Sequence, residues 1–356
     1  MEGGRLLGQG AYGCVFTPKL LCKTPLPSIT QQGVNYSVGK VTTPEEARKE
    51  IIVSSLLRDF PKIHTYFILP IPDCIPEAES KQKDKDVAQC EIIDKKDTEL
   101  KSLIQMKMPL GGKALADIPK TTKNIDFYKF GQQLLEAICI LSTHGIIYND
   151  LHGYNVLLTH PAKPQIIDFG WCSFLNLIKS EDDMAFTSFQ PDKQYDQQPP
   201  EFVIMNALMH NKMSPGKKYT MEEIIDATIV KKHAIRDVII PLFKKTIHEC
   251  KNYLRNFYQH SKTLQNQDFY KFYKMYWHKF DAWSVGVLLT KVYRDLMFDK
   301  SFVESTSYRI HNAMFRNVLE GLTMIDASKR MDTIQALKLW NPQSPLLKNP
   351  KIQAWN

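Results

Sequence analysis

The spacing of hydrophobic residues changes partway along the 356-residue chain. Residues 126–144 and most later apolar segments repeat hydrophobic positions at intervals of three and four, the spacing of a buried helix face. The preceding part contains short apolar runs with the length of β-strands, at 5–7, 14–16, 36–41 and 103–108. The pattern predicts an α+β protein in which a small β-rich part is followed by a larger helical part.

One helix is expected within the β-rich part, directly after the strand-like run 36–41. Thr43 can cap this helix, Pro44 suits its first turn, and two acidic residues follow. Apolar residues then continue at helical spacing as far as Leu57. The helix should therefore begin at residue 44.

Residues 205–278 are predicted to form a helical subdomain that carries a basic excess. Thr220 and Glu223 make a capping box at the start of one of its helices. Counting from residue 211 to 280 gives fourteen Lys and Arg against six Asp and Glu, a net charge of +8 that equals that of the whole chain. The excess indicates either a solvated helical face or a docking surface for an acidic protein partner. We do not expect nucleic acid to bind, because helical spacing places the aromatic residues in the core.

The composition narrows the class of protein further. With 43% hydrophobic and 24% charged residues, the chain is typical of a soluble globular protein. No apolar run approaches the roughly 20 residues of a membrane-spanning helix. Seven cysteines are scattered without C-x-x-C spacing, so we expect buried or free thiols in a reducing compartment rather than disulfides or a zinc site. A cytoplasmic location follows from this expectation.

A glycine-rich segment near the N-terminus is the first candidate for phosphate chemistry. Its sequence is Gly8-Gln9-Gly10-Ala11-Tyr12-Gly13-Cys14-Val15, and strand-like runs flank it on both sides. These flanks indicate a turn between two strands, whereas a dinucleotide-binding fold would open a helix here. Glycines in such a turn leave backbone N–H groups free to face phosphates.

A second group of polar residues follows the predicted helix 126–144. Asp150 and Asn155 lie five residues apart between two apolar runs, and Asp168-Phe169-Gly170 ends a later pair of isoleucines. Phosphoryl transfer requires a carboxylate near the acceptor hydroxyl, and an asparagine and a second carboxylate on a metal ion. In type and order, these residues resemble the catalytic loop and the Asp-Phe-Gly motif of the protein kinase family.

The resemblance implies a role for each matching residue. Lys40 would hold the α- and β-phosphates of ATP and pair with Glu50, or with Glu46 one turn earlier on the helix. Asp150 would act as general base or orient the acceptor hydroxyl, and Asn155 and Asp168 would hold Mg²⁺. The implied nucleotide-binding residues are Gly8, Gln9, Gly10, Gly13, Val15, Lys40, Met106, Lys107 and Met108.

Three positions of the catalytic-loop segment differ from the family pattern. Tyr148 stands in place of a histidine, and Asn149 in place of the arginine that binds an activation-loop phosphate. We therefore expect activity that does not depend on phosphorylation there, although Thr187 and Ser188 are candidate phosphorylation sites. His152 replaces a lysine near the γ-phosphate and gives weaker electrostatic help. It also makes the loop similar to that of small-molecule kinases.

Three later motifs favour a protein kinase over a small-molecule kinase. Pro199-Pro200-Glu201 is similar to the Ala-Pro-Glu that closes the activation segment of protein kinases. The run 280–289 resembles the family's D-x-W-S-x-G helix, in which Asp281 would bind the catalytic-loop backbone. Arg330 matches the arginine that would form a buried pair with Glu201.

The whole resemblance implies a two-lobed protein kinase fold, with an N-lobe at 1–108 and a C-lobe at 109–356 that contains the helical insertion. The segments 13–22 and 36–40 are similar to serine/threonine kinases of large cytoplasmic DNA viruses. They imply an ATP- and Mg²⁺-dependent enzyme of the host cytoplasm or the virion. A pseudokinase scaffold that acts through the basic helical segment and a small-molecule kinase are the alternatives.

Overall fold

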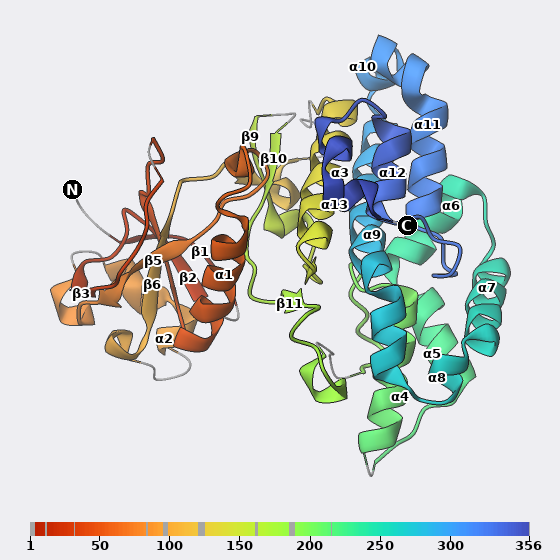
Figure 1. The fold of residues 1–356 in the computed structure, drawn as a ribbon, viewed down its shortest axis with the longest axis horizontal. Coiled ribbons are helices and arrows are strands. Elements are labelled where there is room, and N and C mark those ends of the chain that lie inside the picture. The colour runs from red at the N-terminus through yellow and green to blue at the C-terminus, as the bar shows by residue number, and fades with distance from the viewer. Residues whose placement is uncertain are drawn as a thin grey trace. The chain divides into compact units, whose positions relative to one another are not determined.

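The computed structural model contains two compact units, shown in Figure 1. One unit comprises Met1–Gly112 with Gln165–Gly170, and the other comprises Lys113–Pro164 with Trp171–Asn356. The first is built on a β-sheet and the second is mainly helical, which confirms the predicted α+β class. The structure describes residues 4–10, 13–31, 33–82, 85–94, 99–119, 125–160, 163–184, 189–214 and 216–355.

An antiparallel six-stranded sheet with the order β1-β2-β4-β6-β5-β3 forms the first unit. Strand β4 lies inside this sheet, pairs with β2 and β6, and is buried along its whole length. Its central residue, Lys40, is therefore held in a fixed register opposite Val15 on one side and Met106 on the other. The strands are β1 Arg5–Gly10, β2 Gly13–Thr17, β3 Cys22–Pro25, β4 Val38–Thr42, β5 Ile71–Pro76 and β6 Ile104–Met108.

The long helix of this unit, α1 (Pro44–Leu57), begins where the sequence predicts. The Thr43 side chain accepts a hydrogen bond from the backbone N–H of Glu46 at 3.3 Å, so a capping residue and a first-turn proline define the start. The helix packs against β5 and β6 and buries Ala47, Glu50, Val53 and Leu57. A shorter helix, α2 (Glu91–Asp94), packs against β2.

Four of the seven cysteines form disulfides, so the expectation of free thiols is wrong for them. Cys14 of β2 is bonded to Cys90, and Cys22 of β3 is bonded to Cys74 of the neighbouring strand β5. The partners are 76 and 52 residues apart in sequence and are brought together by the three-dimensional fold, which explains why short-range spacing carries no signal. The free cysteines Cys139, Cys172 and Cys250 are buried, as expected.

Helix α9 (Phe269–Leu296) is the main internal element of the second unit. It packs against α3 (Phe127–Thr143), α11 (Thr306–Leu322) and α12 (Thr333–Trp340). The aromatic run at 269–277 and the motif that begins at Phe280 lie on this one continuous helix, because no proline or glycine interrupts the chain between them.

The predicted helical segment 205–278 is helical in the structure. The capping box between Thr220 and Glu223 starts a helix as expected, and Cys250, Leu254 and Phe257 lie in the core. Two π-helical turns, Ala227–Lys231 and Ala234–Ile239, connect its helices. The remaining helices of the unit are α4 Pro200–Met213, α5 Met221–Asp226, α6 Ile240–Phe243, α7 Ile247–His260, α8 Lys262–Gln265, α10 Lys300–Val303 and α13 Pro350–Gln353.

Short strands form two further sheets. They form a three-stranded sheet with the order β10-β9-β7 and a two-stranded sheet of β11 and β8. The β8–β11 pair joins the chain before Asn149 to the chain after Trp171. Among the described residues, no helix combines the length and the apolar character needed to cross a membrane. The short strands are β7 Lys113–Ala114, β8 Ile146–Ile147, β9 Val156–His160, β10 Lys163–Ile166 and β11 Ser173–Phe174.

Candidate functional site

The glycine-rich segment joins two antiparallel strands, as its flanks predict. Gly10 of β1 pairs with Gly13 of β2, and the two residues between them lie outside the described part of the chain. A Cβ atom on Gly13 would lie 2.6 Å from the carbonyl oxygen of Val41, so this position accepts only glycine without a shift of β4. Gly8 and Gly10 have open space where a Cβ would be. Their lack of side chains therefore leaves the backbone accessible to a ligand.

Two other residues of this segment point in different directions. The Gln9 side-chain oxygen accepts a hydrogen bond from the backbone N–H of Glu91 at 3.0 Å, so Gln9 ties β1 to α2. Val15 is half-buried and lies opposite Gly8 on β1 and Lys40 on β4. Of the two, Val15 has the position that suits contact with a ligand beneath the glycine-rich turn.

Lys40 is a buried cation held by two carboxylates. Its Nζ lies 2.7 Å from Glu50 Oε1 and 3.0 Å from Asp168 Oδ1. Burial alone would lower the pKa of Lys40, but the charges of Glu50 and Asp168 outweigh it and raise this pKa above its usual value. The lysine is therefore fully protonated near neutral pH, which is the state that binds phosphate.

The structure distinguishes between the two candidate glutamates. Glu50 lies on the buried face of α1 and pairs with Lys40, whereas Glu46 pairs with Lys49 at 3.1 Å on the same helix. Glu50 is the partner because it lies on the buried face of α1, which packs on the sheet that carries Lys40.

The Asp-Phe-Gly segment belongs to the same unit as Lys40. Phe169 is completely buried and makes an edge contact with Phe67, with ring centroids 5.9 Å apart. Asp168 has a left-handed backbone with φ of 60°, and 45% of its side chain is exposed. The buried ring therefore anchors the segment while the neighbouring carboxylate stays accessible to a cation.

The predicted adenine-contacting residues lie together on β6. Met106 is fully buried opposite Lys40, while Lys107 and Met108 are half-buried and lie opposite Gly39 and Val38. The Lys107 side chain lies 3.4 Å from Asp73, so its cation is engaged within the sheet.

Asp150 and Asn155 lie together in the second unit. The Asn155 Nδ2 donates to the Asp150 backbone carbonyl and to its Oδ2, each at 3.0 Å. These contacts fix the loop between the two residues. Because the side-chain nitrogen is used in this way, the side-chain oxygen of Asn155 is the atom that could bind a metal ion.

His152 caps the short helical turn Gly153–Asn155, because its Nδ1 accepts from the backbone N–H of Tyr154 at 3.2 Å. The other ring nitrogen, Nε2, then carries the proton and lies 3.5 Å from Asp150 Oδ2. The residue that replaces the family's lysine therefore faces the carboxylate that is expected to act on the acceptor hydroxyl.

Asp281 of α9 binds the backbone of the same loop, as the resemblance predicts. Its two carboxylate oxygens accept from the N–H of Tyr148 at 2.6 Å and of Asn149 at 2.9 Å. The Asn149 side chain donates to the Trp171 carbonyl and to Ser173 Oγ, each at 3.0 Å. Asn149 thus links the loop directly to residues 171–173. In the family pattern, an arginine stands at position 149 and would bind a phosphate group instead.

The predicted pair of Glu201 and Arg330 is present and completely buried. Arg330 Nη1 and Nη2 donate to the two carboxylate oxygens of Glu201 at 2.6 and 2.8 Å. Such a two-pronged pair fixes the start of α4 relative to the segment before α12. Thr187 and Ser188, the candidate phosphorylation sites, lie outside the described residues.

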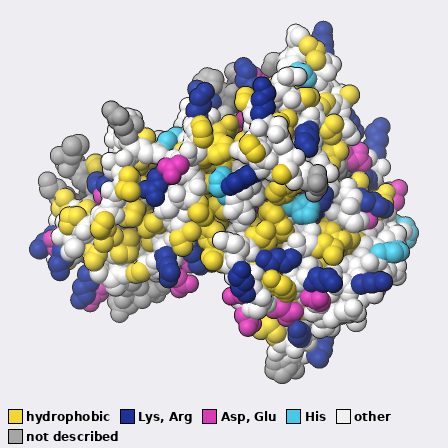
Figure 2. All heavy atoms as spheres, in the orientation of Figure 1, with side chains coloured by type: hydrophobic (Ala, Val, Ile, Leu, Met, Phe, Trp, Pro, Cys, Tyr) yellow, Lys and Arg dark blue, Asp and Glu magenta, His cyan; other side chains and the backbone are white. Residues whose placement is uncertain are grey.

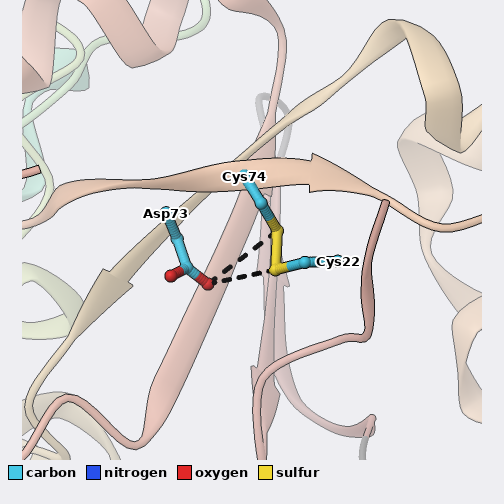
Figure 3. Close-up of side chains that lie close together, drawn as sticks. All are labelled: Cys22, Asp73 and Cys74. Atoms are coloured by element: carbon cyan, nitrogen blue, oxygen red, sulfur yellow. Dashed lines mark hydrogen bonds between the residues drawn. A yellow bond between two sulfur atoms is a disulfide. The ribbon is translucent and has the colours of Figure 1, made fainter. Parts of the chain in front are cut away.

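Cys22, Asp73 and Cys74 form a group whose possible ligand atoms lie within 4.8 Å of one another (Figure 3). The two sulfur atoms are bonded to each other, so neither offers the thiolate that a metal ion requires. Both oxygens of Asp73 accept from Lys19 at 2.8 Å, and Lys107 lies nearby. Because these two lysines already neutralise the carboxylate, the group has the character of a structural ion pair beside a disulfide.

The basic excess at 211–280 is partly neutralised within the unit. Figure 2 shows basic side chains scattered among acidic and apolar ones on the face in view. An acidic partner for this segment stays a prediction. Among the described residues, the intra-unit ion pairs of its Lys and Arg side chains are Lys212–Glu181, Lys217–Glu223, Lys231–Asp192, Arg236–Asp237, Lys245–Glu320, Lys251–Asp226 and Arg255–Glu222.

Sequence reasoning missed one direct contact of Asp150. The Gln197 side-chain amide donates to Asp150 Oδ1 at 2.9 Å, across 47 residues of chain. A glutamine two residues before Pro199 has no feature that distinguishes it from the neighbouring glutamines, so no sequence signal marks it. Searches of the sequence against protein-family models and against curated proteins find no match.

Proposed function

We propose that this protein is an ATP- and Mg²⁺-dependent protein kinase with the two-lobed kinase fold, which transfers the γ-phosphoryl group to serine and threonine hydroxyls. The observation that carries the proposal is the pairing of the buried Lys40 with both Glu50 and Asp168. A buried lysine cation is stable only when it is paired, and here one of its partners is a partly exposed carboxylate in an Asp-Phe-Gly segment. This arrangement supports a phosphate-binding lysine next to a metal-binding aspartate.

The donor atoms suit the proposed cofactors. Mg²⁺ prefers oxygen ligands, and Asp168 in the first unit and Asn155 in the second each offer a side-chain oxygen of this kind. Lys40 and the backbone of the glycine-rich turn would hold the nucleotide phosphates. Bound Mg²⁺ would neutralise phosphate charge during transfer.

Asp150 is the residue proposed to act on the acceptor hydroxyl. Its carboxylate is partly exposed and held by the Asn155 amide, so it can accept a hydrogen bond from a serine or threonine hydroxyl. Catalysis would then rest on positioning and charge neutralisation, with the hydroxyl oriented for in-line attack.

A protein substrate is favoured over a small molecule by features of the second unit. The Glu201–Arg330 pair and the Asp281 contacts with the loop backbone match motifs that distinguish protein kinases in the resemblance. The narrower resemblance to viral serine/threonine kinases is part of the same proposal.

Phosphate transfer from γ-labelled ATP tests the proposal. Wild-type protein, Lys40→Met and Asp150→Asn would be compared on an acidic and a basic protein substrate. Lys49→Met is the matched control, because Lys49 is a half-buried lysine of α1 that pairs with Glu45 and Glu46. We expect wild type to label serine or threonine. The rate of transfer should fall by about 100-fold or more in Lys40→Met and Asp150→Asn, and it should not fall in the Lys49→Met control.

Other outcomes would assign the alternatives. Nucleotide binding without transfer to any protein or small molecule would indicate a scaffold and rule out the proposal of an enzyme. Label found only on a small hydroxyl compound would identify a small-molecule kinase instead.

A further inference from the structure

The four consecutive residues Tyr195–Gln198, here called the strap, are tied down by buried side chains. The amine of Lys232 donates to the carbonyl oxygens of Tyr195 and Gln198, the latter at 2.9 Å. Between these two, Trp283 Nε1 donates to the Asp196 carbonyl at 2.9 Å and Ser284 Oγ to that of Gln197 at 2.8 Å. Every carbonyl of the strap therefore accepts a hydrogen bond from a side chain.

The side chain of Asp196 adds a second set of contacts to the strap. It accepts from Lys291 Nζ at 2.6 Å and from the backbone N–H of Ala234 at 2.8 Å. Burial would raise the pKa of Asp196, but the Lys291 charge and hydrogen bonds outweigh it and hold this pKa below its usual value. The strap is thus fixed by helix α9, which supplies Trp283, Ser284 and Lys291, and by the chain around Lys232 and Ala234.

The side chain of Gln197 reaches the candidate site from the strap. Its amide donates to Asp150 Oδ1 at 2.9 Å, while Asn155 donates to Oδ2 at 3.0 Å. The carboxylate therefore has an amide donor on each oxygen, and rotation of its plane would break both hydrogen bonds. A carboxylate has about four acceptor positions, so these donors leave room for an acceptor hydroxyl.

We propose that Gln197 is a positioning residue that fixes the orientation of the Asp150 carboxylate for the acceptor hydroxyl. The inference rests on the proposed function, because that function assigns Asp150 the role of orienting the acceptor hydroxyl. A neutral amide suits this role, since it can donate a hydrogen bond without adding a charge beside the carboxylate. The rigidity of the strap explains how a side chain 47 residues away in sequence can hold that orientation.

The first test compares the kinetics of Gln197→Ala and Gln197→Glu with those of the wild-type chain. Gln194→Ala is the matched control, because among the described residues the Gln194 side chain bonds to the Gln190 carbonyl and not to Asp150. Loss of one hydrogen bond to a charged group should lower kcat roughly tenfold in Gln197→Ala, with little change in the KM for ATP. The control should retain wild-type kinetics.

Gln197→Glu provides a signature that a general structural role would not give. It keeps the length of the side chain but replaces the amide donor by a second carboxylate beside Asp150, so its kcat should fall at least as far as that of Gln197→Ala while the KM for ATP stays similar. Wild-type kcat in Gln197→Glu would show that the amide donor is not needed, and it would overturn the proposal. Higher activity in Gln197→Ala would mean that the contact blocks Asp150, and it would overturn the proposal.

A second measurement does not require catalysis. The melting temperatures of wild type, Gln197→Ala, Asp150→Ala and the double variant form a cycle, and the contact predicts effects that are non-additive by roughly 2 °C or more. Additive effects would overturn the inference. If wild type transferred no phosphate, the proposed function would fail, and this cycle would still decide whether Gln197 holds Asp150.

Discussion

The backbone N–H of Asn149 donates to the carboxylate of Asp281 at 2.9 Å, although 132 residues separate the two in sequence. Asn149 has a left-handed backbone, with φ of 65°, which asparagine tolerates better than most residues. The contact with α9 therefore fixes an unusual backbone conformation directly before Asp150. The start of the loop is thus held by a carboxylate of a helix.

Replacement of Asp281 by asparagine should make the stability of the protein less dependent on pH. Burial raises the pKa of Asp281 to about 6, against the opposing effect of the N–H groups of Tyr148 and Asn149. Because the folded state holds the proton more tightly than the unfolded state, this carboxyl stabilises the fold most at low pH. That contribution falls as the pH rises from about 4 to about 6.

The advantage of wild type over Asp281→Asn should therefore shrink by about 2–3 kcal/mol between pH 4 and pH 7, as measured by urea unfolding. A difference that stayed constant with pH would show that Asp281 remains ionised throughout this range.

Lys232 should give the opposite trend at higher pH. Burial lowers the pKa of this amine to about 7, well below its usual value, with partial compensation from Asp196 and Glu201. The unfolded chain binds the proton more tightly than the folded chain, so this lysine contributes stability that is complete above about pH 10 and is lost as the pH falls toward 7.

Relative to Lys232→Met, wild type should therefore gain about 2–3 kcal/mol of unfolding free energy between pH 7 and pH 9. Lys231→Met is a control, because the adjacent Lys231 is an exposed residue. Equal slopes for wild type and Lys232→Met would contradict a neutral buried amine.

Alanine should be poorly tolerated at Gly13 and well tolerated at Gly10. A Cβ at Gly13 would lie 2.6 Å from the Val41 carbonyl, whereas at Gly10 it would meet nothing within 4 Å. We expect Gly13→Ala to lower the free energy of unfolding by about 1–3 kcal/mol because β2 and β4 must separate. Denaturant titration of both variants measures this, and equal stabilities would refute the close approach of the two strands.

Thiol titration checks the disulfides. In denaturant without reductant, three cysteines should react, because four of the seven are paired. Substitution of both Cys14 and Cys90 by serine should cost about 2–4 kcal/mol of stability in the oxidised protein. Reaction of all seven thiols in unreduced protein would show that the pairs do not form.

Local signals in the sequence predicted those features that depend on neighbouring residues. The capping residue Thr43 marks the start of α1, and Thr220 with Glu223 marks that of α5, because a cap uses side chains within one helical turn. The resemblance to kinases also predicted long-range contacts, such as that of Glu201 with Arg330. Those contacts came from a known pattern of residues and could not have been derived from spacing alone.

Features that depend on the three-dimensional path of the chain were not predictable. The choice of Glu50 over Glu46 follows from the face that α1 buries, and both positions are glutamates in the sequence. The Cys22–Cys74 disulfide requires knowledge of which strands are neighbours, and the Cys14–Cys90 disulfide depends on where the chain before α2 meets β2. The Gln197 contact depends on how Lys232, Trp283 and Ser284 hold the strap, which no local pattern encodes.

The short segment Gln165–Gly170 has a consequence for how the first unit can form during protein synthesis. It belongs to the N-terminal unit, and Ile166 bonds to the backbone of Tyr66 and Ile68, yet it follows 52 residues (113–164) of the other unit. A fragment that ends at Gly112 would lack Phe169 beside Phe67 and Asp168 beside Lys40. On the ribosome, the N-terminal unit therefore remains incomplete until residue 170 has emerged, and it cannot be excised as one continuous piece.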